Sequence, residues 1–170
     1  ARDRGLILMD AIKTAHATAY SRLLLLAKTG AIGRIVSVDA NCTGMSGLDV
    51  GAANADTIQG SMDYWAPTAI LPVLQLLGDS FVEERYVAFG DSSIAGSDAF
   101  TRASYVFADA VASFKVGRSV KTEGELVVSG TKGYIYVPAP WWKTDYFEVR
   151  HENSDCNKRY FYQLDGEGIR

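Results

Sequence analysis

The pattern of hydrophobic and polar positions changes character near Phe81. Before this residue, two stretches carry apolar side chains at helical spacing. After it, short runs rich in Val, Tyr and Phe alternate with glycine or polar turns, a pattern typical of strands. The runs predicted as strands are Phe81–Phe89, Arg102–Ala108, Ala110–Gly117, Gly124–Val128, Gly133–Val137, Tyr146–His151 and Arg159–Leu164. Two helices followed by a meander of strands predict an α+β fold, a largely antiparallel open sheet with helices packed on one face.

The first part of the chain is predicted to contain a helix between two strands. The apolar run Gly5–Asp10 indicates a short buried strand, although a run this brief also suits a helix segment. Helical spacing begins near Thr14, a suitable N-cap, and Gly30 is placed to end the helix in the left-handed conformation. A strand then covers Arg34–Thr43, and the small, polar residues Gly44–Gly60 indicate an exposed loop.

A second helix is predicted over Met62–Leu77, with Gly78 ending it. Pro67 and Pro72 lie inside this pattern. Each proline lacks a backbone donor and clashes with the carbonyl four residues earlier. We therefore expect a kink, or a true helix start as late as Pro67.

Length and composition describe an ordinary globular domain, which we assign to residues 1–170 as a single unit. Hydrophobic residues make up 48% of the chain and charged residues 22%. The net charge is -3 and basic residues are spread along the sequence, so no nucleic acid and no anionic membrane surface is expected as partner. The longest aliphatic run, Leu23–Ala27, is far shorter than the roughly 18 residues of a membrane span.

The cysteine content favours a reducing compartment. Only Cys42 and Cys156 are present, far apart in the sequence, and a disulfide framework in a chain of this size would need more. We therefore predict a cytoplasmic protein, with a single disulfide between the two left open.

A self-sufficient active site is not visible in the sequence. No G-x-G-x-x-G opens a helix, and no phosphate loop or G-x-S-x-G elbow occurs. His16 and His151 lack metal-ligand spacing, so no metal is expected.

The stretch Gly60–Thr68 is the first candidate site. It opens a helix after a long loop and contains Asp63, Tyr64, Trp65 and Thr68. Exposed amides at a helix start, hydroxyl groups and an aromatic plate suit a polyhydroxylated ligand. The alternative is that Trp65 belongs to the core and Asp63 is only a helix-start charge.

A second candidate is the loop Pro138–Thr144, in which two prolines stiffen the chain around Trp141 and Trp142. Tryptophan commonly stacks on sugar rings or anchors interfaces, but both could instead cap the hydrophobic edge of the sheet. We place the pocket where the Gly60–Thr68 segment meets the helix beginning near Thr14. His16 and Lys13 would approach a substrate from that helix, and the pKa of a histidine is ordinarily near neutrality.

Three ordered segments resemble the C-terminal domain of the Gfo/Idh/MocA family of oxidoreductases. Arg22–Asp39 is similar to the helix that ends in a G-x-I-G-x-I turn before the first long strand. Gly60–Gly78 resembles the family's glycine-led helix carrying an Asp and a His or Tyr, and Ser129–Val137 resembles its late G-T-x-G hairpin. Their order and spacing cover nearly the whole chain.

The resemblance implies one half of a two-domain enzyme acting on a sugar or cyclitol. An N-terminal Rossmann domain would bind NAD or NADP and supply the lysine of an E-K-P motif. The sheet domain would supply the substrate pocket and form a homodimer through its open face. Neither a dinucleotide fingerprint nor E-K-P is present, and the chain opens Ala1-Arg2-Asp3-Arg4 without methionine. We therefore expect a fragment that binds no cofactor and is inactive without its Rossmann domain.

The sequence also departs from the family pattern. The family's Asp-x-x-x-His falls on Asp63 and Pro67 in one register and on Tyr64 and Thr68 in the other, and its usual arginine falls on Ala15. With no relay histidine, Tyr64 or Asp63 would take the general acid/base role beside the absent lysine. The alternative is a non-catalytic sheet domain used for oligomerisation or ligand sensing.

Overall fold

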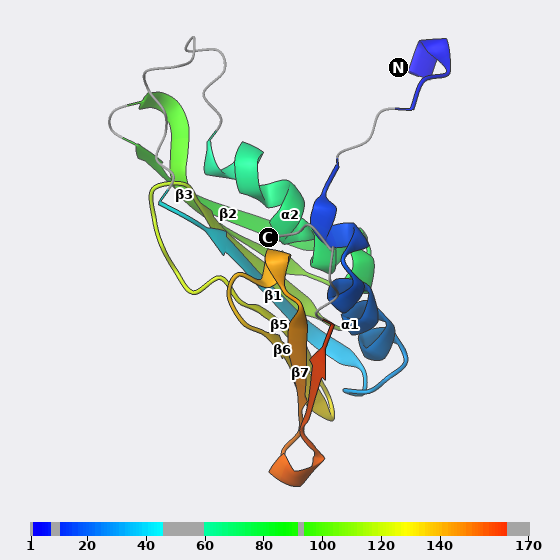
Figure 1. Ribbon diagram of the computed structural model, residues 1–170. Coiled ribbons are helices and arrows are strands. Elements are labelled where there is room, and N and C mark those ends of the chain that lie inside the picture. Colours follow the sequence, from blue (N-terminus) through cyan, green and yellow to red (C-terminus); the bar gives the residue numbers. More distant parts are fainter. Residues whose placement is uncertain (1, 8–10, 46–59, 92–93, 163–170) are drawn as a thin grey trace.

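The computed structural model describes residues 2–7, 11–45, 60–91 and 94–162, and its main elements form one sheet with helices against it (Figure 1). The helical elements are η1 (Arg2–Arg4), η2 (Lys13–His16), α1 (Thr18–Lys28), α2 (Ser61–Leu77), η4 (Trp141–Lys143) and η5 (Ser154–Cys156). The strands are β1 (Ile35–Thr43), β2 (Glu83–Asp91), β3 (Ile94–Val106), β4 (Val111–Gly117), β5 (Leu126–Gly130), β6 (Gly133–Val137), β7 (Tyr146–Arg150) and β8 (Lys158–Phe161).

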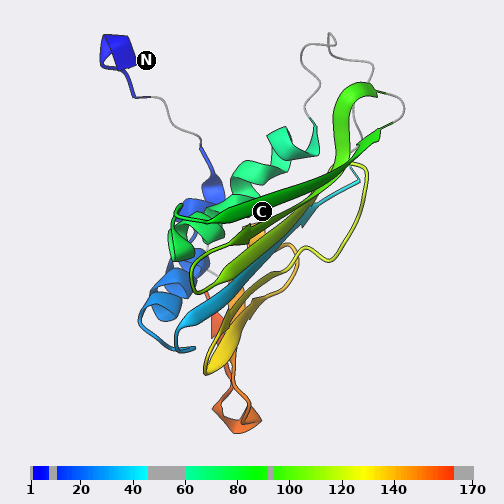
Figure 2. The same ribbon diagram turned by 180° about the vertical axis from the view of Figure 1, so that it is seen from behind.

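The strands form one eight-stranded sheet in the order β2-β3-β4-β1-β5-β6-β7-β8. Only the β1–β4 pair is parallel among these neighbours. α2 packs over β1, β3 and β4, and α1 contacts β7. Seen from behind, the other face of the sheet carries none of the described helices (Figure 2). The predicted fold class, an open, largely antiparallel sheet with helices on one face, is confirmed.

The core lies between the helices and the inner face of the sheet. On β1, alternate residues Val38, Ala40 and Cys42 are fully buried, because successive side chains of a strand point to opposite faces. The largest fully buried side chains are Trp141, Tyr20, Phe114, Phe147, Leu23, Ile32, Leu126 and Ile135. Among the described helices, none has both the length and the apolarity needed to cross a membrane.

Both helix ends predicted from glycine are confirmed. Gly30 follows α1 with φ 84°, and Gly78 follows α2 with φ 81°. Positive φ values are open to glycine at little steric cost, so these two residues stop the helices locally.

The helix starts differ from the prediction. Thr14 is not the N-cap of α1, because it lies inside the short helix η2 and α1 begins only after Ala17. α2 begins at Ser61 and continues through Pro67 and Pro72, so the late start is wrong. Contacts to distant strands hold the first turn of α2 in place, as described below.

The strand predictions are correct in number after Phe81 but shifted at their ends. β3 begins at Ile94, eight residues before the predicted run, because residues 94–100 pair with the end of β2. In the predicted strand Gly5–Asp10, residues 5–7 belong to no strand, and residues 8–10 lie outside the described residues. The predicted loop Gly44–Gly60 also lies mostly outside them.

Candidate functional site

The start of α2 is fixed by β3 and by the residue that follows β4. The Asp98 carboxylate of β3 accepts from the Met62 N–H at 3.2 and 3.3 Å, and the Ser61 hydroxyl donates to the Asp98 carbonyl at 2.9 Å. The same hydroxyl accepts from the Arg118 N–H, just after β4, at 3.0 Å. Gly60 leaves no room for a Cβ beside the Asp98 carboxylate. A negative charge at a helix N-terminus is favourable, so Asp98 caps α2 from outside its own segment.

Three aromatic side chains from two elements meet beside this helix start. Trp65 contacts Tyr64 edge-on, with ring centroids 5.1 Å apart, and Trp142 at 5.0 Å. Tyr64 is 48% exposed, and the Arg118 guanidinium lies 4.7 Å from its ring centroid. The buried Trp65 Nε1 has no hydrogen-bond partner within the described part of the chain. The helix start therefore presents an exposed phenol backed by two tryptophans.

Trp141 supports this cluster from inside the core. It is fully buried, its Nε1 donates to the Asn41 carbonyl at 3.1 Å, and its ring lies 6.0 Å from that of Tyr20. The Tyr20 hydroxyl donates to Gln75 on α2 at 2.7 Å, and burial raises its pKa above the ordinary value. Trp141 thus has no surface for a ligand and instead holds the loop that carries Trp142.

The short helix η2 contacts the aromatic side chains through Thr14, which the sequence suggested as a helix N-cap. The buried Thr14 hydroxyl donates to the Trp142 carbonyl at 2.9 Å, which explains why Thr14 does not cap α1. Lys13 and His16 on the same short helix are exposed. The described contacts bring Thr14, rather than Lys13 or His16, against the aromatic residues.

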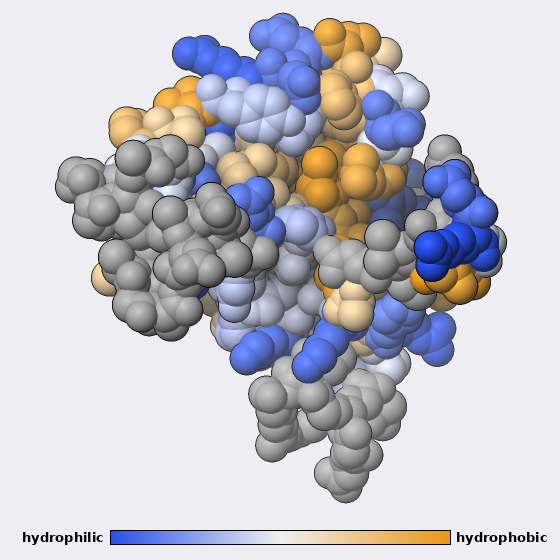
Figure 3. All heavy atoms as spheres, turned by 90° about the horizontal axis from the view of Figure 1, so that it is seen from above, coloured by the Kyte–Doolittle hydropathy of each residue, from blue (hydrophilic) through white to orange (hydrophobic). Residues whose placement is uncertain are grey.

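The remaining predicted site residues lie along α2. Asp63 is exposed in the first turn, and Thr68 is half-buried further along the helix. Together with the Tyr64 phenol, these groups provide a carboxylate acceptor and two hydroxyls within about two turns. Seen from above, hydrophobic residues gather in the middle of the described surface, and others lie at its upper edge among hydrophilic residues (Figure 3).

Two site residues were missed from the sequence, Arg118 and Asp98. Arg118 follows directly after a predicted strand, a position where functional side chains often occur, so this signal was available. Asp98 lies in a polar stretch that carries no strand pattern, and only the fold brings it to α2.

Other features of the surface lie away from this site. A hollow of about 460 Å³ lies on β2 and β3, and another of about 380 Å³ lies at the β5–β6 turn beside His151. The described residues include no group of three or more metal-ligating side chains. Cys42 is buried and Cys156 exposed, and both are free thiols.

The fold and site define an α+β sheet domain with an aromatic, hydroxyl-bearing surface at one helix start. No protein-family model matches the sequence, and no curated protein matches it significantly.

Solved structures with the same fold include oxidoreductases in complex with NADH or NADP. A levoglucosan dehydrogenase in complex with NADH and levoglucosan matches with a TM-score of 0.76 and 18% identity, over 94% of this chain and 48% of that chain. KijD10, a 3-ketoreductase from Actinomadura kijaniata in complex with TDP-benzene and NADP, matches with a TM-score of 0.79 and 14% identity, over 99% and 51%. An NAD-binding oxidoreductase from Klebsiella pneumoniae matches with a TM-score of 0.76 and 16% identity, over 95% and 48%.

The chain spans about half the length of these solved structures. Its fold matches about half of each of these oxidoreductases, in agreement with the fold that the sequence resemblance predicted. Identities below 20% in these three matches establish the fold alone.

Proposed function

We propose that this chain is the substrate-binding and dimerisation half of an NAD(P)-dependent oxidoreductase that acts on a sugar or cyclitol. The observation that carries this proposal is the fold match over nearly the whole chain to half of a levoglucosan dehydrogenase. The free cysteines fit a cytoplasmic parent, and the uncovered sheet face fits a homodimer.

The substrate is proposed to lie against the start of α2. Trp65 and Trp142 would stack on its ring, and the hydroxyls of Tyr64 and Thr68 would bind its hydroxyl groups. Lys13 and His16, exposed on η2, would contact it from the neighbouring element.

The proton transfer is assigned to the Tyr64 phenol, with the Asp63 carboxylate next to it as an acceptor. Tyr64 is exposed, and the Arg118 guanidinium lies over its ring, 4.7 Å from the ring centroid. When the substrate is oxidised, the Tyr64 hydroxyl would accept the proton of the substrate hydroxyl as it passes its own proton to the Asp63 carboxylate, beside a lysine from the other half of the enzyme.

The nicotinamide cofactor is assigned to the missing half. When bound, it would accept or donate the hydride. The described residues do not fit its phosphates, because the first backbone N–H groups of α2 face a carboxylate: Asp98 already accepts from Met62. We therefore place no part of the cofactor at the start of α2.

Two measurements test the proposal. A panel of sugars and cyclitols should change the tryptophan fluorescence of the isolated chain, because two of its three tryptophans line the proposed site.

In the enzyme containing both halves, Tyr64→Phe should lower kcat by roughly two to four powers of ten with little change in KM. An unchanged kcat would remove Tyr64 from the mechanism, and a Trp142→Phe control should affect KM more than kcat.

A second candidate function is a non-catalytic sheet domain for oligomerisation or ligand sensing. Pro67, at the place where the family carries a histidine, favours this reading. The coding sequence upstream of Ala1 distinguishes the two. A strand followed by G-x-G-x-x-G and a later E-K-P would support the enzyme.

A further inference from the structure

Pro67 interrupts the backbone hydrogen bonding of α2 close to its start. The helix continues through Pro67 and Pro72 without a break. Proline has no N–H, so the bond that a residue at either position would donate to the carbonyl four residues earlier is absent. The helix therefore leaves two of its own carbonyls without their usual donor, those of Asp63 and Thr68.

The two carbonyls lie on different sides of α2. Asp63, Pro67 and Leu74 share one helix face, because spacings of four and eleven residues are close to whole turns. Asp63 is exposed and Leu74 is 41% exposed, so this face is turned away from the sheet. Helix carbonyls point towards the C-terminus, so the Asp63 carbonyl is directed along this exposed face towards Pro67. The Thr68 carbonyl is directed instead towards the buried Pro72.

Backbone donors at the helix start are already engaged within the chain. The Met62 N–H donates to the Asp98 carboxylate at 3.2 and 3.3 Å, and the Tyr64 N–H donates to the Gly60 carbonyl at 3.2 Å. Asp63 lies between these two residues and offers acceptors: its exposed carboxylate and the carbonyl that Pro67 leaves free. A ligand at this position is therefore selected for groups that donate hydrogen bonds.

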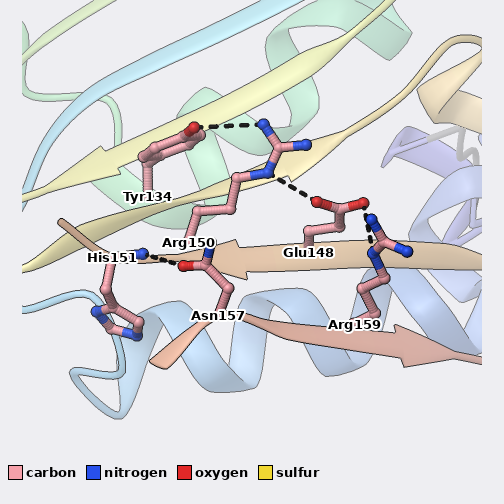
Figure 4. Close-up of polar contacts among 6 residues, drawn as sticks. All are labelled: Tyr134, Glu148, Arg150, His151, Asn157 and Arg159. Atoms are coloured by element: carbon pink, nitrogen blue, oxygen red, sulfur yellow. Dashed lines mark hydrogen bonds and ion pairs between the residues drawn. The ribbon is translucent and has the colours of Figure 1, made fainter. Parts of the chain in front are cut away.

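A second polar cluster, on β7 and β8, is satisfied within the chain. One Glu148 oxygen accepts from Arg150 at 2.7 Å, and the other pairs with Arg159 at 3.2 Å (Figure 4). The His151 N–H donates to the Asn157 side chain at 2.7 Å. Both Glu148 oxygens are thus used, in contrast to the Asp63 carbonyl.

The aromatic side chains beside Asp63 favour a sugar or cyclitol as the donor. Trp65, two positions further along α2, lies 5.1 Å from the Tyr64 ring and 5.0 Å from the Trp142 ring, measured between centroids. A sugar ring stacks on an aromatic side chain through its C–H groups and directs its hydroxyls outward from the ring edge. A ring that contacts Trp65 and Trp142 would bring hydroxyl groups towards the exposed face that carries Asp63.

We propose that the Asp63 carbonyl binds a hydroxyl group of the substrate, and that Pro67 keeps this carbonyl out of the helix hydrogen bonding. The inference rests on the proposed function and adds an acceptor to its substrate site. A backbone oxygen held in a helix has a fixed position, whereas the neighbouring carboxylate rotates. One residue can then accept from two adjacent hydroxyls of a sugar or cyclitol, one through each group.

The test compares two proline substitutions by their effect on sugar binding. Pro67→Ala restores an N–H that closes on the Asp63 carbonyl, so it should raise the Kd of a bound sugar about fivefold, as expected for the loss of one hydrogen bond. Pro72→Ala makes the same backbone change at the Thr68 carbonyl on the buried side and should leave Kd unaltered. The probes are D-glucose, D-galactose, myo-inositol and levoglucosan, titrated against the tryptophan fluorescence of the chain.

Two further measurements separate binding from a merely structural role. Pro67→Ala adds a hydrogen bond to the helix, so urea unfolding should show higher stability together with weaker sugar binding. A residue that only supports the fold would not move these two quantities in opposite directions. The carbonyl carbon of Asp63, read by NMR through the N–H of Tyr64, should change its chemical shift on sugar addition in the wild-type chain but not in Pro67→Ala.

The outcomes distinguish this inference from the proposed function. If none of the four probes binds the wild-type chain, the proposed substrate site and the carbonyl contact both fail. A wild-type chain that binds a probe, with an unchanged Kd in Pro67→Ala, would overturn the contact and leave the site standing. Equal increases of Kd in both proline variants, or a loss of stability in Pro67→Ala, would also overturn it, because the effect would then belong to the helix rather than to the Asp63 carbonyl.

Discussion

The fully buried indole of Trp141 should contribute more to stability than any other side chain near the site. Its ring packs against Tyr20 at 6.0 Å, and its Nε1 donates to the Asn41 carbonyl at 3.1 Å. Truncation of a buried tryptophan to alanine costs about 3–5 kcal/mol through lost burial and the cavity left behind. A buried hydrogen bond adds about 1 kcal/mol. We therefore expect Trp141→Ala to lower the free energy of unfolding by about 4–6 kcal/mol.

Two further substitutions separate the contribution of the buried ring from that of the hydrogen bond to Asn41. Trp141→Phe keeps most of the ring but loses the donor to Asn41, so its cost should be about 1.5–3 kcal/mol. Trp142→Phe, next to it but only half-buried, should cost less than about 1 kcal/mol.

The assay is urea unfolding followed by circular dichroism at 222 nm, with all proteins at one concentration because association also stabilises the folded state. Loss of less than 1.5 kcal/mol in Trp141→Ala would refute the argument that this indole supports the Trp142 loop. Equal costs for Trp141→Phe and Trp142→Phe would refute the role given to the Asn41 bond.

Three other outcomes are expected. Asp98→Ala should lower the free energy of unfolding by about 0.5–2 kcal/mol, because the Met62 N–H loses its acceptor. Asp98→Asn keeps a side-chain oxygen and should lower this free energy by less. Equal losses of the two variants in urea unfolding would contradict a capping role. Because burial raises the pKa of Tyr20, the unfolded state loses this proton first, so stability should fall as pH rises above about 10, by up to about 1.4 kcal/mol per pH unit. Tyr20→Phe should flatten that decline, and an unchanged slope would exclude Tyr20 as its source. Calorimetry should detect no NAD(P) binding to the isolated chain, and a micromolar Kd would contradict the assignment of the cofactor to the missing half.

The sequence by itself determined the local features of this protein. Residue spacing distinguished helices from strands because apolar side chains recur every 3.6 residues on a helix face and every 2 on a strand face. Gly30 and Gly78 marked the helix ends, since glycine adopts their positive φ values at little steric cost. The fold class followed from these features alone. The resemblance to a known oxidoreductase domain rested on the same glycines and strands.

Only the tertiary structure decided which of these residues act together. Thr14 suited a helix cap locally, but a bond to Trp142, 128 residues away, gave it a different role. The adjacent tryptophans looked alike in sequence, yet Trp141 is sealed in the core and Trp142 remains half-exposed. The start of α2 depends on Asp98, 36 residues from Met62 and outside any local capping pattern. Periodicity reports only which face a side chain occupies, whereas its partner depends on how the sheet brings distant strands together, and that information is absent from any short stretch of sequence.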